Sequence, residues 1–394
     1  MSYEGFGVGR LIFFGIRMKV LHITLGLGNG GAEGALFRLA TSDSKNSHVV
    51  ISIMGDGVYG EKLRLAGIEL HSFNVPRGKI KLSAIIKTYQ LIKKIQPDVV
   101  QTWLYHADLL GGVLAKLAGV KGIVWGIRHS NLEPGLNSKF TIMMAKLSAL
   151  LSGLVPSRVI SCSIKAAEVH KKIGYKSDIM TVIPNGYDLD LLKFSEQSRK
   201  RFRTQWELTD HDIVFGMIGR WTPLKDHRNL FSALSILKKT ENFSFKCVLV
   251  GPHIDESNSE LVGLIKEYNI EDSVVLAGSS SDVSGPLSGF DVFVLSSAGE
   301  AFPNVVAESM ACETPCVVTD VGDAAYIVGD WGVVVPPGNS QALANGLLQA
   351  VREIKDTSQW QTKRLGCRAR ILENFSIGSM TKSFVEVWKS TLGK

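Results

Sequence analysis

The sequence contains no apolar run long enough to cross a bilayer. Two apolar stretches come into question, Leu11–Ile16 and Ile142–Val155. The first is too short and Lys146 interrupts the second, whereas a spanning helix needs about 20 apolar residues. The first stretch also lacks a small-residue cleavage site, which argues against a signal peptide. We expect residues 1–17 to form an N-terminal arm or to precede a biological start at Met18, and Ile142–Val155 to form a buried helix.

Cysteine is scarce, and its spacing excludes the common cysteine-based sites. The five cysteines are odd in number and scattered, at Cys162, Cys247, Cys312, Cys316 and Cys367. Cys312 and Cys316 lie four residues apart, but no second Cys or His pair completes a zinc site. We therefore expect a protein of a reducing cytoplasm without structural disulfides.

Acidic residues are sparse in the first half. Residues 1–190 hold 23 Lys and Arg against 13 Asp and Glu, whereas the remainder holds 21 against 24. No acid lies between Arg77 and Ile95, and a predicted helix at 82–95 is ringed by basic residues, at Arg77, Lys79, Lys81, Lys87, Lys93 and Lys94. The basic side of this helix either faces solvent alone or binds an anionic membrane surface. We expect no nucleic-acid partner, and a cytoplasmic location with peripheral contact to the inner membrane face.

Short apolar runs alternate with helical patterns in two series along the chain. This alternation predicts an α/β fold of two Rossmann-like domains with parallel sheets, facing each other across a cleft. We expect the first, acceptor-side domain at 18–190, a linker at 191–208 and the second domain at 209–376. A C-terminal helix at 377–394 is expected to cross back to the first domain.

One stretch organises the second series. The strand Asp291–Leu295 is followed by a loop and then by a helix that begins at about Asn304. Ligands of open α/β sheets bind at the carboxyl ends of strands, and a helix N-terminus suits phosphate or sugar oxygens. Two carboxylates, Glu300 and Glu308, bracket this turn.

A glycine-rich turn, Gly26–Gly31, follows the first strand of the first domain. Such a turn lets the backbone approach a phosphate closely. The turn fits G-x-G-x-x-G, but no acidic residue ends a second strand about twenty residues on, as a dinucleotide site requires. A nicotinamide-dependent oxidoreductase therefore stays only an alternative, and so does a catalytically inactive nucleotide-binding protein.

Two cations, Arg220 and Lys225, share the loop after the strand at 213–218. Fixed cations without a metal suit a diphosphate that gains charge as it leaves. The sequence Asp188-Leu189-Asp190 has the D-x-D pattern of metal-dependent transferases, but it follows Pro-Asn-Gly at the linker. We interpret it as structural and expect no metal cofactor.

From Met18 onward the chain resembles glycosyltransferase family 4, the retaining nucleotide-sugar transferases of GT-B architecture. The matching motifs are Gly30-Gly31-Ala32-Glu33, Ile183-Pro184-Asn185-Gly186, Gly219-Arg220 with Lys225, Ser297 with Glu300 to Glu308, and Phe375-Ser376. The resemblance implies a glycosyltransferase that moves a hexose or N-acetylhexosamine from a UDP-sugar to a lipid-linked or envelope-polysaccharide acceptor.

The resemblance also implies roles for individual residues. Arg220, Lys225, Glu300 and His129 are the implied catalytic residues, and Glu308 is expected to bind the donor ribose. The remaining donor contacts are expected from Gly30, Gly31, Gly219, Ser279, Phe302, Pro303, Asn304 and Val305. In the first domain either His129 or Arg128 fills the position that touches the transferred sugar, and His106 and Asp108 are candidates on the acceptor side.

Overall fold

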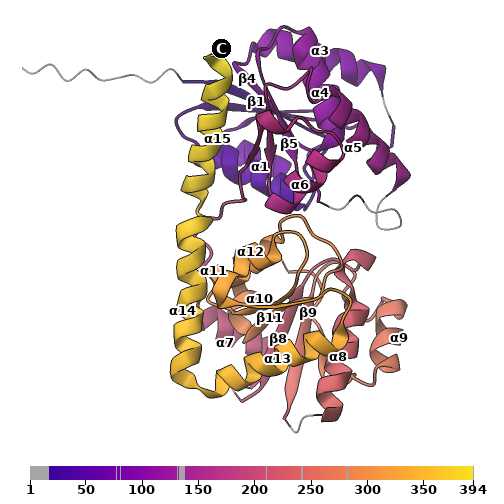
Figure 1. Cartoon of the computed structure of the whole chain (residues 1–394), viewed down its shortest axis with the longest axis vertical. Coiled ribbons are helices and arrows are strands. Elements are labelled where there is room, and N and C mark those ends of the chain that lie inside the picture. Colours follow the sequence, from indigo (N-terminus) through magenta and orange to yellow (C-terminus); the bar gives the residue numbers. More distant parts are fainter. Residues whose placement is uncertain are drawn as a thin grey trace, which may run out of the picture.

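The computed structural model describes residues 17–76, 78–79, 81–130, 132, 138–209, 211–240, 243–280, 282 and 284–393. Within them the chain forms two parallel sheets, each flanked by helices and stacked along the long axis of the molecule (Figure 1). This is the predicted architecture of two facing Rossmann-like domains. Residues 1–16 of the expected N-terminal arm, and Arg77 of the basic segment, lie outside the described residues.

The first sheet has seven strands in the order β3-β2-β1-β4-β5-β6-β7. The strands are β1 (Lys19–Thr24), β2 (Ser47–Ser52), β3 (Glu69–Ser72), β4 (Val99–Thr102), β5 (Gly122–Ile127), β6 (Arg158–Ser161) and β7 (Met180–Val182). The helices are α1 (Gly31–Ser42), α2 (Tyr59–Leu65), α3 (Leu82–Ile95), α4 (Tyr105–Leu117), α5 (Lys139–Leu151) and α6 (Ile164–Lys172), with a 3₁₀ turn at Ser177–Ile179. The strand order reverses between β1 and β4, which is where ligands of such sheets bind.

The second sheet has six strands in the order β10-β9-β8-β11-β12-β13. The strands are β8 (Ile213–Ile218), β9 (Phe245–Val250), β10 (Val274–Leu276), β11 (Val292–Leu295), β12 (Cys316–Thr319) and β13 (Val333–Val335). The helices are α7 (Glu196–Gln205), α8 (His227–Thr240), α9 (Ser259–Glu267), α10 (Ser284–Gly289), α11 (Asn304–Ala311), α12 (Ala324–Val328) and α13 (Ser340–Lys355), with 3₁₀ turns at Pro223–Lys225 and Gly329–Trp331. The order reverses between β8 and β11, so the Arg220 loop and the Glu300 turn are neighbours.

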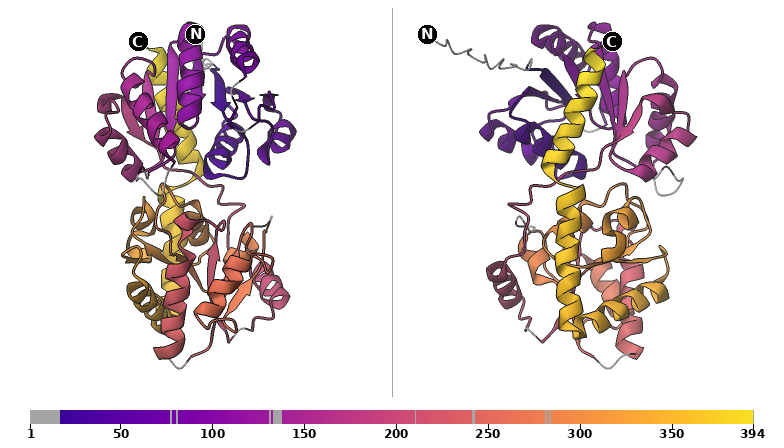
Figure 2. Two further views of the ribbon diagram at one scale, coloured as in Figure 1. Left: turned by 90° about the vertical axis from the view of Figure 1, so that its right-hand side faces the viewer. Right: turned by 60° about the vertical axis from the view of Figure 1, so that its left-hand side comes forward.

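The last two helices, α14 (Thr357–Asn374) and α15 (Ile377–Leu392), run along one side of both domains (Figure 2). Helix α14 packs against α11 and α13 of the second domain, whereas α15 packs against α1 and β5 of the first. Trp388 is fully buried, and its Nε1 donates a hydrogen bond of 3.1 Å to Oε1 of Gln101 in β4. The expected return of the C-terminal helix to the first domain is confirmed.

The segment 191–208 is not a plain linker, because it contains α7, which packs against α10 of the second domain. Nη2 of Arg199 and Nη2 of Arg203 each lie 2.7 Å from one carboxylate oxygen of Asp291, at the entry to β11. Asp291 also accepts a hydrogen bond from the backbone N–H of Val214 in β8. These paired charges fix α7 to the second sheet.

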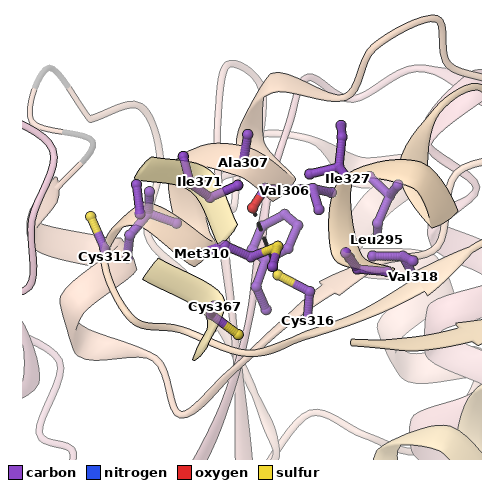
Figure 3. Packing of buried hydrophobic residues seen from close by; sticks show 14 of the residues in the cluster. Leu295, Val306, Ala307, Met310, Cys312, Cys316, Val318, Ile327, Cys367 and Ile371 are labelled. Carbon is purple, nitrogen blue, oxygen red and sulfur yellow. Dashed lines mark hydrogen bonds between the residues drawn. The ribbon is translucent and has the colours of Figure 1, made fainter. Parts of the chain in front are cut away.

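Helix α11 is anchored by a core of apolar and sulfur-containing side chains (Figure 3). Its buried Val306 and Met310 belong to one cluster with Val318 of β12, Ile327 of α12 and Ile371 of α14. Full burial of such a side chain stabilises the fold by about 1.5–3 kcal/mol, so this packing holds α11 in place. The position of its N-terminus at the cleft is therefore set by the core of the second domain.

Helix α5 differs from the sequence-based expectation of a buried helix. Only its small residues Ala145, Ser148 and Ala149 are fully buried, and large apolar side chains on its opposite face are exposed. No helix among the described residues is long and apolar enough to span a membrane.

Candidate active site

The turn after β11 holds a carboxylate and a lysine in direct contact. Nζ of Lys225 donates to Oε1 of Glu300 at 2.7 Å, and Oγ of Ser297 donates to the same oxygen at 2.8 Å. Both charged side chains are mostly buried, with 18% of Lys225 and 17% of Glu300 exposed. The structure therefore brings together two of the predicted catalytic residues, and the pair lies at the strand ends that face the first domain.

Arg220, the other predicted cation of this loop, is exposed and makes no hydrogen bond with its guanidinium among the described residues. Its charge acts on Glu33 of α1, across the cleft. Burial raises the pKa of Glu33, and the positive charge of Arg220 opposes that rise. Arg220 is thus a cation that an incoming anion can bind without breaking an ion pair.

The N-terminus of α11 meets the first domain through Asn304. Its Oδ1 accepts hydrogen bonds from Nδ2 of Asn185 at 2.9 Å and from the hydroxyl of Tyr187 at 2.6 Å. A Cβ placed on Gly31, the first residue of α1, would lie 2.6 Å from Nδ2 of Asn304, so a larger residue here would displace the Asn304 amide. The sequence analysis used the Pro-Asn-Gly motif only as a family match and assigned no role to Asn185. It did not identify Tyr187 as a site residue.

Two further contacts connect the domains. Oγ of Ser130, after β5, donates to the backbone carbonyl of Glu300. The carboxylate of Asp323, before α12, accepts from the backbone N–H groups of Ile164 at 2.8 Å and Lys165 at 3.0 Å, and so caps α6 of the other domain. No local sequence signal marks Asp323 or Ser130, because each acts on a segment more than 150 residues away.

Glu308 lies on α11, facing the first domain. Burial raises its pKa, and the charges of Arg38 and Lys225 oppose that rise. Arg38 comes from α1, where its Nε donates to the carbonyl of Gly186 at 2.8 Å and its guanidinium lies 4.9 Å from the Tyr187 ring. Arg38 is a cationic neighbour of Glu308 that the sequence analysis did not identify.

Arg128 and His129 follow β5, at the cleft edge of the first sheet. Nη1 of Arg128 donates to Oδ1 of Asn185 at 2.6 Å, and the guanidinium lies 4.5 Å from the Trp103 ring. Its Nε and Nη2 are buried without a hydrogen-bond partner among the described residues, and burial lowers its pKa. His129 packs edge-on against Tyr105, with ring centroids 6.4 Å apart. The sugar contact by either residue stays a prediction.

The two acceptor-side candidates lie in different environments. His106, in the first turn of α4, is partly exposed, and its ring centroid lies 5.5 Å from that of Phe140. Asp108 is fully buried, and its Oδ1 accepts from Oγ1 of Thr102 and from the backbone N–H of Gly126. Burial raises the pKa of Asp108 to about 8. In this structure Asp108 joins the ends of β4 and β5 inside the core, and its contact with an acceptor stays a prediction.

A cavity of about 390 Å³ lies beside Ser279, one of the predicted donor contacts. Ser279 and Ser280, after β10, line one side, and Phe202 and Trp206 of the α7 segment line another. A planar base fits an aromatic-lined cavity of this size. The side chain of Phe302 is buried against Phe375, at 5.7 Å between ring centroids, which leaves only its backbone to face a sugar.

Other predicted residues occupy supporting positions. Pro303 is the N-cap of α11, Val305 is in its first turn, and a Cβ on Gly219 would lie 3.1 Å from Cε of Lys225. Oδ1 of Asp188 accepts from the backbone N–H groups of Asp190 at 3.0 Å and Leu191 at 3.3 Å, so this carboxylate stabilises a turn.

Comparison with known proteins agrees with this geometry. The family model "Glycosyltransferase Family 4" matches residues 29–191, and the model "Glycosyl transferases group 1" matches residues 198–364. Together they account for both domains.

Similar curated proteins include two bacterial transferases. The UDP-Gal:alpha-D-GlcNAc-diphosphoundecaprenol alpha-1,3-galactosyltransferase of Escherichia coli is 24% identical, over 75% of this chain and 76% of its own length. The N,N'-diacetylbacillosaminyl-diphospho-undecaprenol alpha-1,3-N-acetylgalactosaminyltransferase of Campylobacter jejuni is 25% identical, over 75% of this chain and 79% of its own length.

Among solved structures, Anabaena HepE in complex with UDP-glucose superposes with a TM-score of 0.82 at 25% identity, over 95% of this chain and all of that one. These likenesses remove the oxidoreductase alternative. The chain belongs to glycosyltransferase family 4 and has the GT-B fold of two facing Rossmann-like domains.

Proposed function

We propose that this glycosyltransferase moves a hexose or N-acetylhexosamine from a UDP-sugar to a lipid-linked acceptor of envelope polysaccharide assembly, with retention of the anomeric configuration. The observation that carries the proposal is the convergence of Lys225, Glu300 and the N-terminus of α11 at the cleft, opposite Gly31. The E. coli and C. jejuni relatives, by their names, transfer sugars to diphosphoundecaprenol acceptors, which supports the same acceptor class here.

In this proposal Arg220 and Lys225 hold the donor diphosphate and stabilise the charge that it gains as the glycosidic bond breaks. Glu308 accepts hydrogen bonds from the ribose, and the cavity beside Ser279 takes the uracil. Glu300 and the backbone of 302–305 bind the transferred sugar, and His129 contacts it from the other domain. No metal takes part, because the two cations and the helix end supply the positive charge.

The protein acts at the inner face of the cell membrane in this proposal. The lysines of α3 are exposed, and each cation near an anionic bilayer contributes about 1 kcal/mol. Such contact keeps the first domain close to a lipid-linked acceptor.

The test is a screen of UDP-glucose, UDP-galactose, UDP-N-acetylglucosamine and UDP-N-acetylgalactosamine against a bacterial membrane lipid extract, read by mass spectrometry. We expect one donor to give a lipid whose mass increases by one sugar residue, and the Arg220→Ala variant to lose that product. Absence of any sugar transfer from all four donors would refute the proposed reaction.

A further inference from the structure

Helix α5 carries a row of large apolar side chains that are exposed over at least 41% of their surface. Phe140, Met143, Leu147 and Leu150 are 53%, 52%, 41% and 74% exposed. Their spacing of three, four and three residues places them on one face of the helix. Leu154, just beyond the helix, continues the row and is 69% exposed. We refer to these five residues as the α5 row.

The opposite face of α5 explains why this row points outward. The fully buried residues of the helix are small, namely Ala145, Ser148 and Ala149, so the backbone lies close to the domain and the large side chains face away from it. Soluble proteins rarely expose a contiguous apolar surface of this kind unless it binds something.

The charge around the row indicates what it binds. Lys139 and Lys146 lie on the same helix, and there is no acid from Lys139 to Leu154. Across residues 77–157 the sequence holds 11 Lys and Arg but three Asp and Glu. An apolar helix face flanked by lysines is typical of binding in the interface of an anionic bilayer. A symmetric contact between two copies of this chain would bring these like charges together, which disfavours self-association.

Neighbouring helices extend the same surface. Helix α4 packs against both α3 and α5, and the three lie on the side of the first domain away from α15 (Figure 1). On α3, Leu82 and Ile86 are 71% and 47% exposed beside the exposed lysines of that helix. The helices beside the α5 row thus carry further exposed apolar and cationic side chains.

The row starts at the cleft. Strand β5 ends at Ile127, on the cleft edge of the first sheet, and leads to the N-terminus of α5. Phe140 in that first turn contacts His106, the predicted acceptor-side residue, with ring centroids 5.5 Å apart. A bilayer that contacts the row therefore reaches the mouth of the cleft at the His106 side.

We propose that the α5 row inserts into the headgroup region of an anionic membrane, while the lysines of α3 and α5 hold the surface there electrostatically. That insertion presents a lipid-linked acceptor to the cleft rests on the proposed function. Insertion of the α5 row into a membrane does not depend on that function.

The test compares matched double variants for binding to vesicles of phosphatidylcholine with and without phosphatidylglycerol. Met143→Asp/Leu147→Asp changes the α5 row. Leu365→Asp/Leu372→Asp changes two residues of α14 that are 52% and 48% exposed and is the control. We expect the first to weaken binding to anionic vesicles at least about tenfold and the second to leave it unchanged. Circular dichroism checks that both fold.

The depth to which the α5 row inserts into the bilayer is measured with an environment-sensitive dye attached to a cysteine. All five native cysteines are buried, so Leu147→Cys offers one accessible thiol, and Leu365→Cys is the matched control. We expect a blue shift on vesicle binding for the dye at 147 and none for the dye at 365. The charge-reversed Lys87→Glu/Lys93→Glu/Lys94→Glu variant should lose the preference for anionic lipid, because these lysines contribute the electrostatic part.

Three outcomes would overturn the proposal: no vesicle binding by the parent, unchanged binding by the α5 double variant, or a parent dimer that this variant dissociates. Calorimetric titration with UDP separates this result from the proposed function. If the parent binds vesicles through α5 but neither binds UDP nor transfers a sugar, the proposed function fails and the insertion stands.

Discussion

Nζ of Lys225 lies 2.7 Å from Oε1 of Glu300, and this ion pair connects the predicted diphosphate site to the predicted sugar site. Both side chains are mostly buried, so the two charges are weakly screened by solvent. A donor diphosphate that draws Lys225 toward itself leaves Ser297 as the hydrogen-bond donor to Glu300. The negative charge of Glu300 is then no longer neutralised by the lysine. We infer that binding of the diphosphate prepares Glu300 for its role at the sugar.

Replacement of either cation should lower turnover. For Arg220→Ala and Lys225→Ala we expect a loss of 100- to 1000-fold, about 2.7–4 kcal/mol, because each contact strengthens as the leaving group gains charge. Steady-state kinetics should show that kcat falls more than donor affinity. The control is Lys238→Ala, which removes an ion-paired lysine on the outer side of the same domain. Near-normal turnover in both cation variants would disprove the diphosphate assignment.

Substitution of Glu300 and of Glu308 should change different kinetic parameters. Glu308→Gln should mainly raise the donor KM, because hydrogen bonds to the ribose are present in ground and transition states alike. Glu300→Gln should mainly lower kcat, because its charge faces the positive charge that develops at the anomeric carbon. NMR of the product should show retained configuration in both. An inverted product, or wild-type kcat for Glu300→Gln, contradicts these roles.

Chelation should leave the activity largely unchanged. Arg220, Lys225 and the N-terminus of α11 supply the positive charge that a metal provides in other transferases. The measurement is initial rate with and without EDTA, followed by added Mn²⁺. Abolition by EDTA and recovery with Mn²⁺ would assign Asp188 and Asp190 a ligand role instead.

Asp108 should make stability depend on pH. Its pKa is raised by burial from 3.8 to about 8, so the folded protein keeps this proton over a range in which the unfolded chain has lost it. Stability therefore falls as pH rises between these values. Asp108→Asn, which mimics the protonated acid, should flatten this dependence and stabilise the fold at pH 8 by at least about 1 kcal/mol.

Urea denaturation at pH 5 and pH 8 measures the effect. The control is Asp178→Asn, at an exposed acid that pairs with Lys176 on the surface and should leave the slope unchanged. An Asp108→Asn variant whose stability still falls with pH as in the parent would show that Asp108 is already ionised when folded.

Local sequence patterns predicted the parts of the structure that are determined by residues close together in the sequence. Helix α3 spans the predicted 82–95, and α11 begins at the predicted Asn304. Both follow from apolar spacing and from residues that start or stop a helix. The Glu300 turn was found for the same reason, since strand, loop and helix are contiguous in the chain.

Contacts between distant segments were not predictable in this way. Periodicity placed apolar residues around α5 but did not show which face would meet the sheet, because small residues rather than large ones form the buried side. The role of α7 depends on Asp291, which lies about 90 residues later. The cap that Asp323 forms on α6 has no signature in either segment.

The crossing of α15 has a consequence for how the chain is made. The buried Phe384 and Trp388 close the core of a domain whose last strand, β7, ends at Val182. Synthesis at about 5–20 residues per second then leaves that core uncovered for roughly 10–40 s after its own residues have been made. During this interval Gln101 and its apolar neighbours have no Trp388 to contact. A nascent first domain is therefore a natural client for chaperones until the last helix leaves the ribosome.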